Sequence, residues 1–177
     1  MAHCGWEADL AIGWSLAHTK RMEWQLLAKD FASCDGSLCD IYVQNASVDD
    51  WQAVIDSLRQ SKFRLELQID GQVTELPRDV SKLLFRDPSA SRPSMYVHIG
   101  NTTLNCHFFT AEEIEFDLNP RDMRPELLPD VLSFLKLLGR ATSKPVILTV
   151  ENTPEAAIMR FETTNSEVEY VGPAYSS

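Results

Sequence analysis

Two stretches of this chain, residues 41–76 and 114–162, switch between strand-like and helix-like patterns in the same order. This shared order constrains the fold more than any other feature, because each stretch predicts a strand, a helix and two further strands. The first helix is predicted to begin at Ser47, since Ser47 and Asp50 have the spacing of a capping box. Asp70-Gly71 then predicts a tight hairpin turn.

The second stretch contains a predicted helix over residues 126–138 that is apolar over more than half of its circumference. Gly139 is expected to end this helix as a C-terminal cap. Hairpins dominate the connections, so we predict an α+β fold with a mostly antiparallel sheet and helices packed on one face. The shared order favours two β-α-β-β-type units related by duplication, although any α+β chain can show such a pattern by chance.

The chain length predicts a single domain over residues 22–177, with two halves at 38–86 and 95–171 as an option. Met22 opens a second plausible chain start. We therefore expect residues 1–21 to be a peripheral N-terminal extension.

The charge of the chain excludes several classes of partner. It has 26 acidic residues against 16 Lys and Arg, for a formal net charge of -10. We therefore expect no nucleic acid and no membrane as partner, because both attract basic surfaces. No apolar run is long enough for a transmembrane helix. The N-terminus lacks the basic start of a secretory signal, so we expect a cytoplasmic location.

Short motifs of catalysis and cofactor binding are missing from the sequence. The seven glycines are too widely spaced for a Walker A loop or a G-x-G-x-x-G turn. The sequences H-E-x-x-H and C-x-x-C do not occur, and the four histidines lack zinc-ligand spacing. We therefore expect no cofactor and no metal, and we favour a protein that is not an enzyme.

The negative charge is concentrated in two windows, residues 110–130 and 151–177, which carry net charges of -5 and -4. Alternate residues of a strand share one face, so the acids of the predicted strand near 113–118 should form one surface. We predict that this surface docks a basic protein partner. A solvated outer sheet face is the alternative. The predicted partner-binding residues are Glu112, Glu113, Glu115, Asp117, Glu167 and Glu169.

Arg78, Lys82 and Arg86 recur every four residues along a helix predicted over residues 77–86. They would form a basic stripe that binds an anion or complements the acidic surface, within the chain or across a homodimer. Ordinary solvation of the helix is the other interpretation.

His98, Cys106 and His107 lie on a hairpin predicted from strands near 95–99 and 103–109. The two histidines could approach each other across it, whereas Cys106 and His107 should point to opposite faces. This set is the alternative site, for a ligand-binding or enzymatic domain with a pocket near the hairpin. Packed or half-exposed strand histidines are the simpler interpretation.

The four cysteines do not form a recognisable disulfide framework. Cys34 and Cys39 could reach each other in a loop around Asp35-Gly36, as a disulfide or redox pair. Reduced thiols in a cytosolic protein are the alternative.

The leading functional hypothesis is a small, acidic, non-catalytic protein-binding module. An immunity or inhibitor protein is one concrete form of it, by class analogy alone. The alternatives are the ligand-binding or enzymatic domain and a structural homo-oligomer subunit. Such a subunit would associate through the 126–138 helix or an exposed sheet edge.

Overall fold

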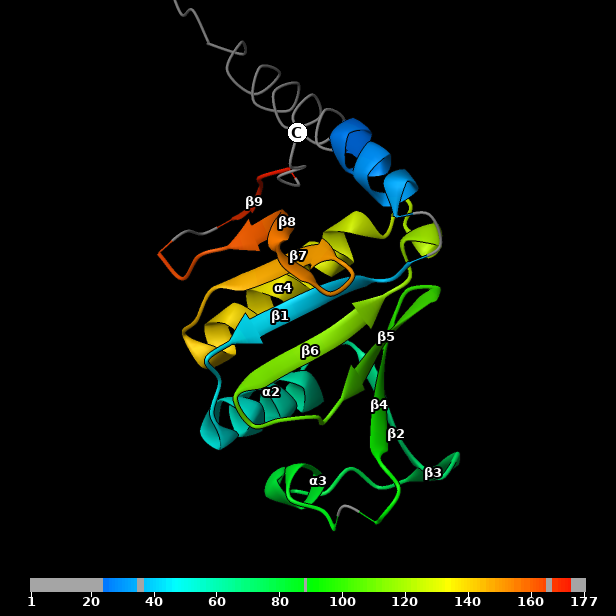
Figure 1. Ribbon diagram of the computed structural model, residues 1–177, viewed down its shortest axis with the longest axis vertical. Helices are drawn as coiled ribbons and strands as arrows, with labels where there is room; N and C mark the ends of the chain where they lie inside the picture. The colour runs from blue at the N-terminus through cyan, green and yellow to red at the C-terminus, as the bar shows by residue number, and fades with distance from the viewer. Residues whose placement is uncertain (1–23, 35–36, 88, 165–166, 173–177) are drawn as a thin grey trace, which may run out of the picture.

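A computed structural model of the chain describes residues 24–34, 37–87, 89–164 and 167–172 (Figure 1). Nine strands form one sheet in the order β3-β2-β4-β5-β6-β1-β7-β8-β9, and every neighbouring pair is antiparallel. The predicted α+β fold with a mostly antiparallel sheet is therefore confirmed. The predicted extension, residues 1–21, lies outside the described residues.

The chain order of the elements follows the predicted alternation. Residues 24–33 are helical and precede the first strand. The remaining elements are β1 (Cys39–Gln44), α2 (Val48–Gln60), β2 (Arg64–Ile69), β3 (Gln72–Thr74), α3 (Ser81–Leu84), β4 (Pro93–Ile99), β5 (Thr102–His107), β6 (Glu113–Leu118), the 3-10 turn η1 (Pro120–Asp122), α4 (Leu128–Thr142), β7 (Val146–Val150), β8 (Thr153–Phe161) and β9 (Val168–Tyr170).

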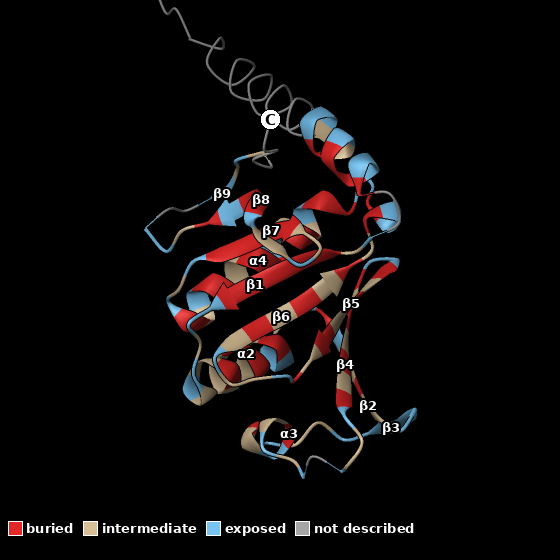
Figure 2. Ribbon diagram, in the orientation of Figure 1, coloured by how far each residue is buried: buried red, intermediate tan, exposed pale blue. Residues whose placement is uncertain are grey.

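Helices α2 and α4 lie side by side on one face of the sheet, while no helix of the described residues lies in front of the opposite face of β1, β6 and β7 (Figure 1). The sides of α2 and α4 that face the sheet are buried (Figure 2). The ring of Phe134 on α4 packs edge-on against Phe116 of β6, with centroids 4.9 Å apart. It also contacts Phe63 at 5.9 Å. The main core therefore lies between the sheet and these two helices.

Two local signals of the sequence determine the structure as predicted. Ser47 caps α2: its hydroxyl accepts from the backbone N–H of Asp50, and the Asp50 carboxylate accepts from the Ser47 N–H. Asp70 and Gly71 both have positive φ, 53° and 70°, which is the geometry of a two-residue hairpin turn. Both predictions are confirmed.

The predicted end of the second long helix is wrong. Helix α4 runs through Gly139 to Thr142 and ends at Ser143, whose φ of 54° is left-handed. A Cβ on Gly139 would lie 2.3 Å from a ring carbon of Phe161 in β8. The glycine therefore permits the close approach of helix and sheet instead of ending the helix.

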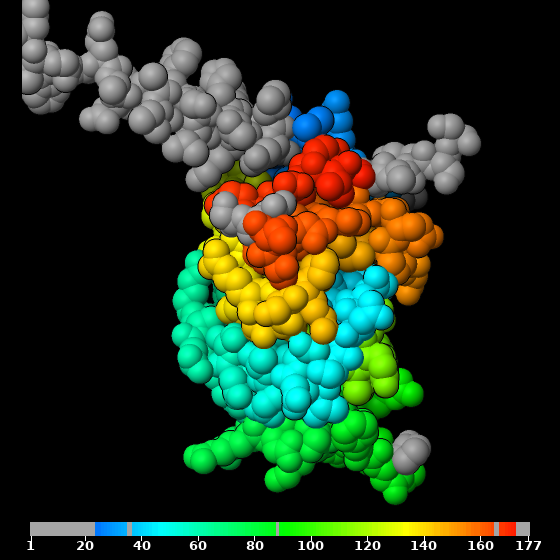
Figure 3. Space-filling view, turned by 90° about the vertical axis from the view of Figure 1, so that its left-hand side faces the viewer, coloured from blue at the N-terminus to red at the C-terminus, as the bar shows by residue number. Residues whose placement is uncertain are grey.

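The two β-α-β-β units keep the same order of elements but occupy the sheet differently. In the first, α2 connects β1 to β2 across three intervening strands. In the second, α4 connects β6 to β7 across β1 alone. An internal duplication therefore stays a prediction. Figure 3 shows the segment around α3, in green, at one end of the molecule and strands β8 and β9, in orange and red, at the other.

Candidate functional site

Three carboxylates meet on the helix-free face of the sheet. Asp117 of β6 pairs in register with Asp40 of β1, and Glu115 pairs with Tyr42. Directly opposed residues of an antiparallel pair share a face, so all four side chains lie together. Oxygens of Asp40, Glu115 and Asp117 lie within 4.8 Å of one another. We call these three residues the carboxylate trio.

Asp40 is the most enclosed member of the trio, with 2% of its surface exposed. Its Oδ2 accepts a hydrogen bond of 2.8 Å from the Tyr42 hydroxyl and one of 2.7 Å from the backbone N–H of Asn152. The Tyr42 hydroxyl also lies 3.3 Å from Glu115 Oε1. Tyr42 therefore links two carboxylates that would otherwise repel each other across the strand pair.

No lysine or arginine of the described residues forms an ion pair with the trio. Among the described residues, His107 approaches the trio: its Nε2 lies 3.6 Å from Asp117 Oδ2. Burial, followed by the charges of Asp40 and Asp117, raises the pKa of Glu115 to about 7. Burial also raises the pKa of Asp117, although His107 opposes that rise. The trio therefore concentrates negative charge that no lysine or arginine of the described residues neutralises.

Carboxylate oxygens are the donors that Mg²⁺ and Ca²⁺ prefer. Clustered acids are nevertheless common without an ion, so we assign no metal to the trio.

The residues around the trio are polar on one side and apolar on the other. The row that contains Asp117 continues through Asn105 and Tyr96 to Glu66 of β2. On the other side, Tyr42 packs with Ile147 and Ala157 in a small second cluster. We define the acidic face as the helix-free side of β1 and β6, where Glu113, Glu115 and Asp117 are half-buried and Asp40 and Tyr42 are buried.

The structure brings together only part of the predicted partner-binding set. Strand β6 alternates as expected, with Glu113, Glu115 and Asp117 opposite three buried apolar residues. Glu112 precedes the strand, and its carboxylate accepts a hydrogen bond from the Thr110 hydroxyl. It is therefore not part of the acidic face.

The other two predicted acids lie beside the last strand of the sheet. Strand β9 is four places from β6 in the sheet, a distance of about 19 Å. Glu167 pairs with Lys136 of α4, which belongs to the helix-covered side. Glu169 lies opposite Arg160 in register. The structure therefore separates both residues from the carboxylate trio.

Asp40 and Tyr42 belong to the site, although the sequence analysis did not select them. The signal was present, because both alternate with Cys39, Ile41 and Val43 along a predicted strand. What the sequence does not give is that β1 lies beside β6, because 68 residues separate the end of one strand from the start of the other.

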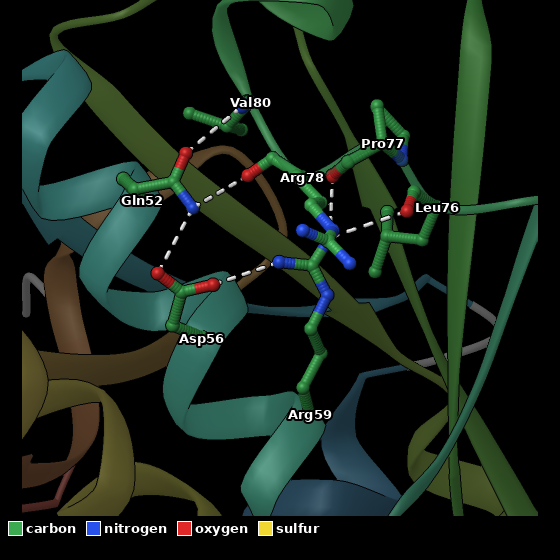
Figure 4. Close-up of polar contacts among 7 residues, drawn as sticks. All are labelled: Gln52, Asp56, Arg59, Leu76, Pro77, Arg78 and Val80. Atoms are coloured by element: carbon green, nitrogen blue, oxygen red, sulfur yellow. Dashed lines mark hydrogen bonds and ion pairs between the residues drawn. The ribbon is translucent and has the colours of Figure 1, made fainter.

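The predicted helix over residues 77–86 is wrong, and so is the basic stripe along it. Only Ser81–Leu84 is helical. Two side chains of α2 bind the backbone before it (Figure 4): the Arg59 guanidinium donates to the carbonyls of Leu76 and Pro77, and the Gln52 amide donates to that of Arg78. The Gln52 carbonyl accepts from the Val80 N–H. These contacts provide hydrogen-bond partners for backbone carbonyl and N–H groups that would pair with one another in a longer helix.

The basic residues of the predicted stripe are consequently not repeats along one helix. Arg78 precedes α3 and Arg86 follows it, so only Lys82 lies within the helix. The Arg86 Nε is buried and has no hydrogen-bond partner among the described residues.

The hairpin set His98, Cys106 and His107 does not converge. His98 lies opposite Thr103 and His107 opposite Ser94, so the two histidines are separated by about 13 Å along the strand. Each imidazole Nδ1 lies 3.3 Å from the hydroxyl opposite it. Cys106 is fully buried on the core side, where burial raises its pKa. The predicted approach of the histidines is therefore wrong.

Two surface hollows lie away from the acidic face. One, of about 310 Å³, lies between residues 24–32 and residues 120–124. The other, of about 200 Å³, is lined by Arg86, Arg92, Phe108 and Phe109, among others. Ligand pockets usually measure roughly 300 to 1,000 Å³. Neither hollow includes the trio or the hairpin set.

Comparisons of the sequence with models of protein families and with curated proteins, and of the structure with solved structures, found no significant match. Among the described residues, no helix is both long enough and apolar enough to cross a bilayer.

Proposed function

We propose that this protein is a small, acidic, non-catalytic binding module that docks a basic partner protein through the acidic face. One observation carries the proposal: three carboxylates lie within 4.8 Å of one another without a lysine or arginine partner among the described residues. A guanidinium or ammonium group placed against them would remove repulsion and form charge-assisted hydrogen bonds.

The electrostatics of the face support a cationic partner in two ways. The pKa of Glu115 is raised to about 7, so part of its charge is suppressed in the unbound protein near neutral pH. A bound cation would lower that pKa, so Glu115 would be more fully ionised in the complex. The net charge of -10 would also speed the encounter with a basic surface.

The surroundings of the trio favour a protein over a small ligand. Tyr42, Ile147 and Ala157 beside the carboxylates are buried, so the accessible part of this face is formed by the carboxylates of β6. Neither of the two hollows lies on this face. An immunity or inhibitor protein that neutralises a basic partner in the cytoplasm is one concrete form of the proposal, by class analogy.

The other hypotheses have less support. The ligand-binding alternative depends on the hairpin set, whose members lie apart. The homo-oligomer alternative depends partly on the apolar helix, but α4 buries its apolar side against this chain's own sheet. Homodimerisation through the edge strands β3 and β9 stays a hypothesis, for which light scattering across a dilution series is the test.

An arginine-rich peptide titrated into the protein at low ionic strength is the defined probe. Amide shifts in an NMR spectrum should locate binding on β1 and β6. A triple variant, Glu113→Gln with Glu115→Gln and Asp117→Asn, should lose most of the affinity. The matched control is Asp70→Asn with Glu75→Gln and Glu126→Gln, which removes the same charge from exposed turns and loops. It should bind almost as the original chain does.

Equal losses in the two triple variants would show that bulk charge, not the acidic face, attracts the peptide. The same three proteins then serve as baits for native capture at low salt. A basic protein retained by the original chain and by the control, but not by the face variant, supports the proposal. Capture of no basic protein, or equal retention by all three baits, would overturn it.

A further inference from the structure

Two thiols of this chain lie in direct contact outside the acidic face. The Sγ atoms of Cys34 and Cys39 are 3.3 Å apart. Cys34 follows the helical residues 24–33, and Cys39 is the first residue of β1. Both are buried, with 4% and 0% of their surfaces exposed. The fold therefore holds two cysteines from different elements at a separation that a small movement would close to a covalent bond.

The hydrogen bonds around the pair assign different roles to the two sulfurs. The Cys34 thiol donates to the carbonyl oxygen of Asp30, also at 3.3 Å. Its single hydrogen is then committed, so the hydrogen between the two sulfurs comes from Cys39. Burial raises the pKa of both thiols, but the bond between them opposes the rise at Cys34 and adds to it at Cys39. Cys34 is therefore the sulfur that ionises first.

We infer that Cys34 and Cys39 form a redox pair in which peroxide oxidises Cys34 and Cys39 then closes a disulfide. The inference does not depend on the proposed function. We name hydrogen peroxide as the oxidant because a small reagent is needed to reach a thiol with 4% of its surface exposed.

The Cys34 thiolate attacks one peroxide oxygen, the O–O bond breaks, and hydroxide leaves and takes up the proton that Cys34 released. Cys34 is then a sulfenic acid. The Cys39 sulfur attacks the Cys34 sulfur, the S–O bond breaks, and the hydroxyl leaves as water with the proton of Cys39. The two thiols lose two electrons and two protons, and the peroxide is reduced to two waters.

The bond would join the end of the helical segment to the first residue of β1. Leu27 and Phe31 of that segment are already buried in the main core. The disulfide would therefore add a covalent bond to a segment that packing and the hydrogen bond from the Tyr170 hydroxyl to Asp30 hold in the reduced protein. It would do so beside Asp40, the next residue in β1, without changing the direction of that side chain, because Cys39 and Asp40 point to opposite faces.

The full-length native protein treated with peroxide tests the inference directly. Remaining thiols are alkylated in denaturant, and the chain is digested with trypsin. Cleavage after Lys29 and Arg59 leaves Cys34 and Cys39 together on a peptide that holds no other cysteine. We expect this peptide without alkyl groups and lighter than its reduced form by two hydrogens. Both thiols alkylated, or a link to Cys4 or Cys106 instead, would overturn the inference.

Variants test the assigned order of the two sulfurs. In Cys39→Ser the sulfenic acid at Cys34 has no second thiol to react with, so dimedone should label Cys34 strongly, whereas the original chain should show little label. Cys106→Ser is the matched control, since it removes a buried thiol from β5 and should still form the disulfide. Equal dimedone labelling of the original chain and Cys39→Ser would rule out the role of Cys39. The peptide mass of the original chain decides the matter even if a variant does not fold.

Discussion

The two faces of the central sheet are built from the same strands but have opposite chemistry. On the helix-covered face, Phe116 of β6 packs against Phe134 of α4 and both are fully buried. On the other face, the neighbouring residues Glu115 and Asp117 lie with Asp40 in a cluster of like charge. Because alternate residues of a strand point to opposite sides, one strand supplies both surfaces. The packed face can therefore stabilise a fold that holds repelling carboxylates on the other.

The two faces should therefore differ in how substitutions on them change stability. Changes on the helix-covered face should lower stability at every pH, because they remove apolar contacts. Changes on the acidic face should have pH-dependent effects, some of them stabilising, because the groups there repel one another. The largest change in the free energy of unfolding is expected in the core.

Phe134→Ala should lower the free energy of unfolding by about 3–5 kcal/mol, because it leaves a cavity between Phe63 and Phe116. Urea denaturation at neutral pH measures the loss. The matched control is Phe109→Ala, the same substitution at a side chain that is 55% exposed. A loss at Phe134 no larger than that at Phe109 would contradict the described core.

Glu115→Gln should raise stability at neutral pH, the opposite sign to the core variant. The pKa of Glu115 is about 7 in the folded chain against an ordinary 4.5, so the unfolded chain releases its proton first as pH rises. Stability is therefore lost between about pH 4.5 and pH 7, by up to roughly 3 kcal/mol, and the loss is complete above that range.

The glutamine variant should abolish that part of the pH dependence. Urea denaturation at a series of pH values from 4 to 8 compares it with the original chain. Glu113→Gln, two residues away on the same face and outside the trio, is the control for the charge change. A slope unchanged by Glu115→Gln, or removed equally by Glu113→Gln, would show that the crowding at Glu115 is not its cause.

The sequence predicts elements well where a local pattern is decisive. The capping box at Ser47 and the Asp70-Gly71 turn involve neighbours in the chain, and both form. It fails where tertiary contacts override the pattern. Gly139 has the residue type of a helix cap. It lies inside the helix instead, where the ring of Phe161 occupies the space that a Cβ would fill. The helix predicted at Arg78 is lost because α2 binds the backbone carbonyl there.

The candidate site shows the same limit. Alternation alone predicts that Glu113, Glu115 and Asp117 share a face. The partners that give the trio its character, Asp40 and Tyr42, come from a strand far away in the sequence. Only the sheet order brings them together, and a single sequence does not give the order in which antiparallel strands pair.

Tyr42→Phe should lower stability at neutral pH by about 1–2 kcal/mol, since the hydroxyl donates to Asp40 and lies between two carboxylates. The loss should shrink at low pH, where protonation of the carboxylates removes much of the repulsion. Tyr96→Phe removes a hydroxyl from β4 on the same face and serves as the control. If both variants lose the same stability at all pH values, the hydrogen bonds between Tyr42 and the carboxylates do not contribute specifically to stability.

Glu167→Gln should have the smallest effect, on stability and on binding alike. Glu167 is the same residue type as Glu115, but its side chain is 76% exposed and pairs with Lys136 on the helix-covered side. Exposed ion pairs contribute little to stability, because water screens them and ordering two long side chains has an entropic cost. The change in the free energy of unfolding should therefore fall within the error of denaturation experiments.

The same variant separates local from bulk electrostatics. Glu115→Gln and Glu167→Gln each remove one carboxylate, and so one formal charge, one on the acidic face and one away from it. Affinity for the arginine-rich peptide should fall in the first and stay nearly unchanged in the second. Equal losses would mean that the peptide responds to total charge, and the contrast between the two faces would then concern stability alone. Unequal losses would assign recognition to the face whose carboxylates lack a cationic partner within the described part of the chain.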